Sequence, residues 1–312
     1  MDIFLLILGL LTLVGSGEVL VRGAAGIALK AKISPLIVGL TVVSIGTSAP
    51  ELFASVTAAL NGNSGLAVGN VVGSNIANLA LVLGITAVIY PITVDRLLIR
   101  LDGPVMAAAT LLFILFAWDM EISQGEGIIL ITALVVFLLT LIRRARKEPS
   151  AVDNEVEELE GFGKKGYGFL FILILIGCIG LYFGSDWFVT GASNIASSLG
   201  VSDHIIGVTV VAFGTSVPEL VASAIAALRK QSDISIGNLV GSNIFNVLGV
   251  LGVTATLTPL PIDQKVIDSD MWWMLGIALL IFPMIRMGYK IVRWEGIVLI
   301  GIYIAYIATV LL

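Results

Sequence analysis

One forty-residue passage of this chain occurs twice, and each copy places an acidic side chain inside otherwise apolar sequence. Residues 39–78 and 207–246 align without a gap at an offset of 168, and 24 of the 40 aligned positions are identical. Most of the polar positions are among these identities. Three of them are Thr47, Ser48 and Glu51, which recur as Thr215, Ser216 and Glu219. A chain that repeats its few polar groups in this way is expected to build one site from two similar halves.

The composition restricts the fold to an integral membrane protein. Hydrophobic residues make up 58% of the chain and charged residues 12%, whereas charged residues make up about 25% of a soluble protein. We therefore predict an all-α membrane protein with ten transmembrane helices, five in each half. The predicted spans are 3–29, 35–60, 66–90, 103–118, 124–142, 167–186 (with a continuation to 200), 204–228, 235–260, 271–285 and 294–311.

The basic residues indicate how these spans are oriented. If the N-terminus is external, 15 of the 17 lysines and arginines fall on the cytoplasmic side, as the positive-inside rule requires. The opposite loops carry acidic residues such as Asp119, Glu121 and Asp268. We therefore predict a multi-pass protein of the plasma (inner) membrane, with the lipid bilayer as its surroundings and both termini extracellular or periplasmic.

Five spans per half give the two repeats opposite orientations in the membrane. The prediction is an inverted-topology pair with broken helices at the midplane. Its parts are a first repeat at residues 1–142, a charged cytoplasmic linker at 143–165 and a second repeat at 166–312. The middle of the linker is acidic and lacks apolar periodicity, which favours a solvated tether over a binding site for a regulatory cation.

Glu51 and Glu219 are the strongest candidates for a functional site. An ionised side chain at mid-membrane costs at least about 2.5 to 3.5 kcal/mol, so something must compensate its charge. Pro50 has no amide proton to donate to the carbonyl of Gly46, and Pro218 has the same relation to Gly214. Both copies should therefore break their helix and release carbonyl oxygens inside the membrane.

The surrounding side chains supply further oxygen atoms. Ser44, Ser48 and Glu51 stand at i, i+4 and i+7, and Ser74 and Asn78 form an i, i+4 pair on the next helix. Carboxylate, amide, hydroxyl and carbonyl oxygens suit hard cations, not zinc or copper. Two glutamates match the charge of one Ca²⁺, while the same oxygens divided into smaller subsites suit Na⁺. We expect these ions as transported substrates and predict no cofactor.

Other polar and small residues of the repeat have simpler expected roles. Glu18 and Arg22 are predicted to form an ion pair within the first helix, in preference to a role in gating or ion access, and Asp186 is the repeat mate of Glu18. Four glycines form small-xxx-small patterns that should let the third and eighth helices approach the broken ones closely. They are Gly69, Gly73, Gly237 and Gly241.

The motifs GTSAPE at 46–51 with GNVVGSNIAN at 69–78, and GTSVPE at 214–219 with GNLVGSNIFN at 237–246, resemble the two α-repeats of the cation/calcium exchanger superfamily. They are most similar to its prokaryotic sodium/calcium exchangers, and the resemblance covers nearly the whole chain. It implies an antiporter that moves Na⁺ one way and Ca²⁺ the other by alternating access, with the first and sixth helices sliding as a pair across the other eight.

The resemblance also implies roles for individual residues. Ca²⁺ contacts would come from Glu51, Glu219, Thr47 and Thr215. Na⁺ contacts would come from Ser44, Ser48, Ser74, Ala212, Ser216 and Ser242, with the two glutamates shared. Asn78 and Asn246 are further candidate ligands. Some relatives carry Asp at the position of Asn246, and its replacement by Asn here weakens a proton-coupled or potassium-coupled reading.

Other functions remain as alternatives. A calcium/proton exchanger would use Glu51 and Glu219 as proton carriers, and a cation channel would use similar oxygens with no counter-ion. An intramembrane hydrolase is disfavoured because neither Ser48 nor Ser216 has a His or Lys within its motif to activate it, so we predict no enzymatic activity. We expect no nucleic-acid or protein partner.

Overall fold

The helices of the first half follow the predicted apolar segments. The computed structural model describes residues 1–147, 162–200, 212–286 and 288–311. The elements up to residue 147 are α1 (Asp2–Ala31), α2 (Pro35–Val38), the π-helical turn η1 (Gly39–Val43), α3 (Ser44–Thr47), α4 (Ala49–Leu60), α5 (Ser64–Ile76), the π-helical turn η2 (Ala77–Val82), α6 (Leu83–Ile89), β1 (Ile92–Thr93), the π-helical turn η3 (Leu98–Asp102), α7 (Gly103–Ala117), β2 (Glu121–Ile122) and α8 (Gln124–Lys147).

The second half repeats this order. Its elements are α10 (Tyr167–Ser198), α12 (Ala212–Thr215), α13 (Val217–Leu228), α14 (Ser232–Phe245), the π-helical turn η5 (Asn246–Leu251), α15 (Gly252–Leu257), β3 (Leu260–Pro261), the π-helical turn η6 (Val266–Asp270), α16 (Met271–Arg286), β4 (Lys290–Ile291) and α17 (Arg293–Leu311).

The described residues contain eight helices that are long and apolar enough to cross a membrane. The helices Pro35–Thr47 and Ala49–Leu60, bent by 43° at their junction, make a ninth span if they are counted as one. Ten spans therefore stay a prediction. The predicted span 204–228 begins in residues 201–211, which lie outside the described part of the chain. What is described of it is α12 and α13. Because α13 has only 12 residues, it is about 18 Å long, too short to cross the bilayer core alone.

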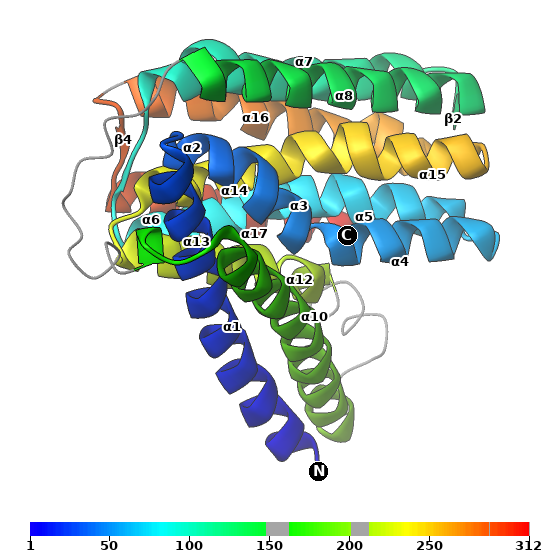
Figure 1. Ribbon diagram of the computed structural model, residues 1–312. Coiled ribbons are helices and arrows are strands. Elements are labelled where there is room, and N and C mark those ends of the chain that lie inside the picture. The colour runs from blue at the N-terminus through cyan, green and yellow to red at the C-terminus, as the bar shows by residue number, and fades with distance from the viewer. Residues whose placement is uncertain (148–161, 201–211, 287, 312) are drawn as a thin grey trace.

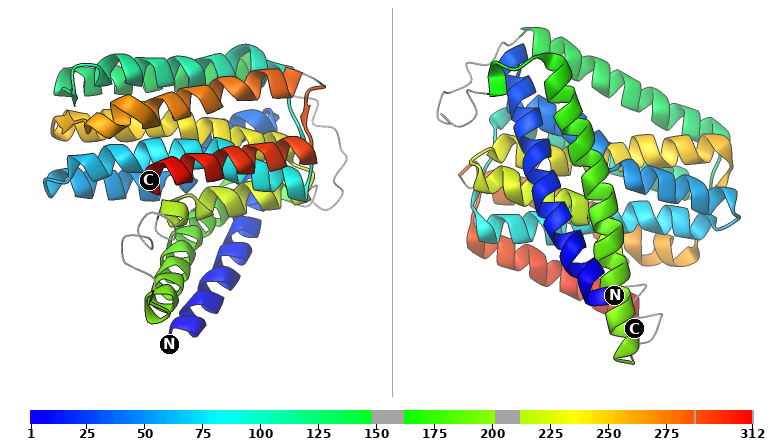
Figure 2. Two further views of the ribbon diagram at one scale, coloured as in Figure 1. Left: turned by 180° about the vertical axis from the view of Figure 1, so that it is seen from behind. Right: turned by 60° about the horizontal axis from the view of Figure 1, so that its bottom comes forward.

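Helices α1 and α10 lie side by side and slope away from the other helices (Figures 1 and 2). They run antiparallel, because Gly191 near the end of α10 lies against Leu6, and Gly177 near its middle lies against Leu20. A methyl group added to Gly177 would come within 2.9 Å of the Leu20 backbone. Glycine is therefore what allows the backbones of this pair to approach so closely.

The remaining helices form a bundle in which the two halves are joined at both ends. Strand β1 pairs antiparallel with β4, with Ile92 opposite Ile291. Strand β2 pairs with β3 in the same way, with Ile122 opposite Leu260. Each ribbon contains one strand from each half of the chain, so the halves are interleaved and do not form separate bodies.

Buried amides at the centre of the bundle also join the halves. The side-chain nitrogen of Asn75 donates to the Asn243 carbonyl at 3.3 Å, and that of Asn243 donates to the Asn75 carbonyl at 3.3 Å. Asn75 and Asn243 are 168 residues apart, so a residue and its own repeat mate exchange equivalent bonds. This reciprocity places a local two-fold relation between α5 and α14 at this point.

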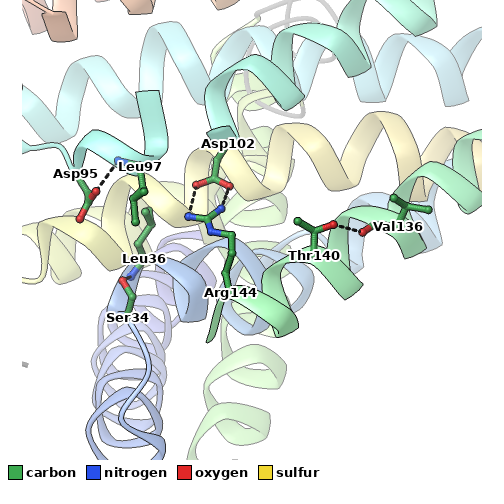
Figure 3. Close-up of polar contacts among 8 residues, drawn as sticks. All are labelled: Ser34, Leu36, Asp95, Leu97, Asp102, Val136, Thr140 and Arg144. Atoms are coloured by element: carbon green, nitrogen blue, oxygen red, sulfur yellow. Dashed lines mark hydrogen bonds and ion pairs between the residues drawn. The ribbon is translucent and has the colours of Figure 1, made fainter. Parts of the chain in front are cut away.

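One ion pair fixes the end of α8 against the start of α7. Arg144 holds Asp102 through two nitrogen–oxygen contacts of 2.6 and 3.3 Å (Figure 3). Asp102 is 1% exposed, and its charge is balanced directly by the guanidinium. Nearby, the Ser34 hydroxyl accepts a bond from the Leu36 amide at 3.3 Å and caps α2 (Figure 3).

Candidate ion-binding site

The break predicted at each GTSxPE motif is present. Ser48 separates α3 from α4 with φ −88° and ψ 5°, and Ser216 precedes α13 with φ −91° and ψ 1°. The proline in each motif lies within the first two residues of the second helical segment, where its missing amide proton is tolerated. Glu51 and Glu219 therefore each lie in the first turn after a break.

One of the predicted free carbonyls has a specific partner. The Gly214 carbonyl, which Pro218 cannot bond, accepts a 2.6 Å hydrogen bond from the hydroxyl of Ser185 on α10. The repeat mate of Ser185 is Gly17, which has no side chain to make the same bond to Gly46. The second break is thus attached to the α1–α10 pair by a bond that the first break lacks.

Glu219 is bound by the opposite half of the chain. The Ser48 hydroxyl donates to its Oε1 at 3.0 Å, while its Oε2 has no hydrogen-bond partner in the described residues. Beside it, Thr47 donates to the amide oxygen of Asn238 at 3.0 Å and lies 3.5 Å from the Ser242 hydroxyl. These contacts bring the Thr and Ser of the first copy onto α13 and α14 of the second.

Glu51 has a different environment. It is 0% exposed, and neither carboxylate oxygen has a hydrogen-bond partner among the described residues. Its charge is close enough to Glu219 for the two carboxylates to interact. On the same side, the hydroxyls of Ser74 and Thr215 are 3.5 Å apart, a contact that mirrors the one between Thr47 and Ser242.

Three of the remaining predicted ligands are buried polar groups without a partner among the described residues. Asn78 and Asn246 are 0% exposed, and no described residue bonds either amide oxygen or nitrogen. The Ser216 hydroxyl is equally without a partner. Such atoms cost about 1 to 3 kcal/mol each when left unsatisfied, and they are rare in native proteins. An arrangement of unpartnered carboxylate, amide and hydroxyl groups fits a hard cation.

Two further predicted ligands have their own contacts. The Ser44 hydroxyl is buried against Gly241 of α14 and donates to the Thr41 carbonyl of η1 at 3.2 Å. Ala212 is the first residue of α12, so it enters only through its backbone. Asn238 was absent from the predicted set, although it bonds Thr47 directly. The sequence signal was available, because Asn70 and Asn238 are identical positions of the repeat.

The glycines of the second copy pack as predicted. A methyl group added to Gly237 would lie 2.7 Å from the Leu36 carbonyl, so α14 touches the first broken helix there. For Gly69 and Gly73 the prediction stays untested, because the residues at the repeat offset from Leu36 and Leu40 fall in 201–211, outside the described part of the chain. Two cavities of about 520 and 250 Å³ both reach Thr215. The described residues therefore close the site on the α14 side.

These features define a class of protein, a polytopic helical membrane protein with an oxygen-rich cation site formed by two broken helices. The model of the sodium/calcium exchanger protein family matches residues 1–143 and 169–312. The chain is 31% identical over 344 residues to the sodium/calcium exchanger MaX1 of Methanosarcina acetivorans, covering 98% of this chain and 97% of that relative. It is 37% identical over 312 residues to the inner membrane protein YrbG of Escherichia coli, covering 97% and 95%.

A solved structure agrees with this relationship. The sodium-calcium exchanger NCX_Mj, soaked with Na⁺ and Ca²⁺, superimposes with a TM-score of 0.83 at 33% identity, covering 98% of this chain and 97% of that one. The chain belongs to the sodium/calcium exchanger family.

Proposed function

We propose that this protein is a secondary antiporter that exchanges Na⁺ for Ca²⁺ across the membrane. The observation that carries this function is the pair of buried carboxylates, Glu51 and Glu219, which no basic side chain neutralises among the described residues. A charge of −2 in a site of low dielectric requires bound cations. The exchanger relatives and the match to NCX_Mj support the identity of these ions.

The charge of the site also determines whether exchange moves net charge across the membrane. One Ca²⁺ neutralises the two glutamates, whereas three or more Na⁺ leave a net positive charge, because Asn78 and Asn246 are neutral amides. Exchange of one Ca²⁺ for three or more Na⁺ is therefore electrogenic and responds to membrane voltage. In this arrangement Thr47 and Thr215 contribute to Ca²⁺ binding. The other predicted ligands, Ser44, Ser48, Ser74, Ala212, Ser216 and Ser242, complete the Na⁺ subsites.

The proposed architecture is ten spans in two inverted repeats, 1–142 and 166–312, joined by the cytoplasmic linker 143–165, with both termini external. The antiparallel packing of α1 against α10 and the reciprocal bonds of Asn75 and Asn243 support it. Alternating access then consists of movement of the α1–α10 pair across the bundle. The bond from Ser185 to the Gly214 carbonyl couples this movement to the second broken helix.

Family membership disfavours the calcium/proton alternative. A channel would need a continuous pore, but the packing of Gly237 against Leu36 closes one side of the site. MaX1 and NCX_Mj are named as exchangers, and the Ser48 hydroxyl donates to Glu219 instead of to a base that would activate it for hydrolysis.

The decisive experiment is ⁴⁵Ca²⁺ uptake into proteoliposomes under clamped membrane potential. The vesicles are loaded with Na⁺, with choline, or with acid buffer and choline. We expect uptake only with internal Na⁺, and a change in its rate when the clamped voltage is changed. Uptake driven by internal protons alone would move the protein to the calcium/proton class, and uptake with choline would indicate a channel.

The hydroxyls of Ser74 and Ser242 provide a test of the Na⁺ subsites. Ser74→Ala and Ser242→Ala each remove one neutral oxygen, which stabilises a bound Na⁺ by about 1 kcal/mol on the scale of a single hydrogen bond. We expect the Na⁺ concentration at half-maximal exchange to rise about fivefold, with a smaller change in Ca²⁺ affinity by isothermal titration.

The matched control is Thr86→Val, which removes a buried hydroxyl that bonds the Val82 carbonyl of its own helix at 2.7 Å. This variant is expected to leave both ion affinities unchanged. Equal losses of Na⁺ and Ca²⁺ affinity in the serine variants would contradict the division into subsites.

A further inference from the structure

Two acidic positions outside the ion site recur at the 168-residue offset. The two copies differ in whether an arginine pairs with the acidic side chain. In the first half, both acids are bound by arginine. Glu18 Oε1 lies 2.5 Å from Arg22 Nε and 2.6 Å from Arg229 Nη2. Asp102 is held by Arg144 at 2.6 Å (Figure 3). Both carboxylates are therefore neutralised within the protein.

The repeat mates of these acids are Asp186 and Asp270, and the arginines have no counterparts there. Position 190 is a threonine where the first half has Arg22, and Asn61 stands where the second half has Arg229. Among the described residues, no basic side chain forms an ion pair with Asp186 or Asp270.

The surroundings of Asp270 confirm that its charge is only partly satisfied. Its carboxylate is hydrogen-bonded to Tyr306, while Oδ1 is buried without a partner in the described residues. Lys265 is near enough to interact through its charge. However, the Lys265 ammonium donates to the Val310 carbonyl at 2.9 Å instead of pairing with Asp270.

Both unpaired acids line cavities that lead to the ion site. Asp186 lines the cavity of about 520 Å³ together with Asn61 and Thr215. Asp270 lines the cavity of about 250 Å³ together with Ser74 and Thr215. Thr215 is common to both, so the two acids lie on the two approaches to the same proposed ligand. Asn61 and Asp270 belong to the side of the molecule that the basic residues predict to be external.

We propose that Asp186 and Asp270 form an acidic vestibule that concentrates Na⁺ and Ca²⁺ at the external approaches to the site. The proposal rests on the antiport function and orientation proposed above. Clefts lined by one sign of charge raise the local concentration of counter-ions. The interaction energy is proportional to the charge of the ion, and the local concentration depends exponentially on that energy. The concentration of Ca²⁺ is therefore raised by the square of the factor that applies to Na⁺. Glu18 and Asp102 supply no such field, because arginine cancels it.

The test compares Asp186→Asn, Asp270→Asn and the double variant with the wild type in right-side-out and everted membrane vesicles. A charge about 6 to 7 Å from an ion in water changes its concentration roughly threefold. For each single variant in right-side-out vesicles, we expect half-saturating concentrations about threefold higher for Na⁺ and about ninefold higher for Ca²⁺. Both differences should shrink when choline chloride raises the ionic strength. Everted vesicles, which present the cytoplasmic face, should show no change.

The matched control is Asp268→Asn. Asp268 lies two residues from Asp270 and its carboxylate accepts a bond from Gln264 at 2.9 Å, but it lines neither cavity. Effects of Asp268→Asn as large as those of Asp270→Asn would overturn the proposal, as would equal fold-changes for the two ions or changes at both faces. If Asp270→Asn fails to fold, Asp186→Asn provides the same test at an exposed position. A wild type without Na⁺-dependent Ca²⁺ exchange would count against the antiport function instead.

Discussion

Replacement of Glu51 by glutamine is expected to abolish Ca²⁺ exchange while the folded protein stays in the membrane. Glutamine has nearly the same shape but removes one of the two charges that balance bound Ca²⁺. Removing one partner of a buried ion pair costs about 3 to 5 kcal/mol, and each 1.4 kcal/mol is tenfold in affinity. We therefore expect a loss of at least about 100-fold in Na⁺-dependent ⁴⁵Ca²⁺ uptake.

The repeat mate gives an internal comparison. Glu219→Gln should lose Ca²⁺ exchange to a similar extent, since it removes the same charge. The two variants should differ in thermal stability. Glu51 makes no side-chain hydrogen bond in the described residues, so its neutralisation relieves repulsion between the two carboxylates in the ion-free protein. Glu219 accepts a bond from Ser48, so its replacement weakens that contact.

Glu295→Gln is the matched control for loss of a buried glutamate. Glu295 is 3% exposed and accepts a bond from the Val292 amide at 2.8 Å, which the glutamine oxygen can keep. This variant should exchange ions like the wild type. Wild-type exchange in either Glu51→Gln or Glu219→Gln would refute the assignment of the carboxylates to the ion site.

The second large effect is expected from Gly237, where α14 contacts the first broken helix. Valine at Gly237 would place its Cβ 2.7 Å from the Leu36 carbonyl and 3.1 Å from the Leu40 amide nitrogen. Both are backbone atoms that cannot move aside, and overpacking of this kind costs about 1 to 3 kcal/mol. Gly237→Val should therefore destabilise the conformation described here.

Gly237→Val should also slow exchange at least about tenfold, because a transport cycle needs both conformations. Hydrogen–deuterium exchange of α2 and α14 checks this, with faster exchange expected in both helices. Unchanged exchange in α2 and α14 together with wild-type transport would contradict the prediction.

The sequence signals for the proposed site are local. Glu51 and Glu219 are conspicuous in apolar spans, and Pro50 and Pro218 predict the helix breaks from their own chemistry. The bend at Ser48 confirmed the first break. The structure also brings Thr47 to Ser242 and Ser74 to Thr215, although nothing in the spacing of either copy specifies those pairs.

The count of ten spans stays a prediction, because the start of the predicted span 204–228 lies outside the described residues. Hydropathy treats 204–228 as one continuous segment, but the described part is divided at Ser216 into α12 and α13. A helix break inside a span releases carbonyl oxygens for the proposed site and shortens the helical segments on either side of the break. Hydropathy averages over such a break and does not detect it.

The sequence by itself determined that this is a helical membrane protein with a duplicated polar motif and two intramembrane carboxylates, since apolar length, repeat offset and residue chemistry are properties of the chain. Only the tertiary structure decided that Ser48 binds Glu219 across the repeat, that Gly237 packs against the Leu36 carbonyl, and that arginines neutralise Glu18 and Asp102 but not their mates. These features depend on how distant helices are placed against one another. Two nearly identical motifs have the same local preferences, so the difference between them arises only from their packing.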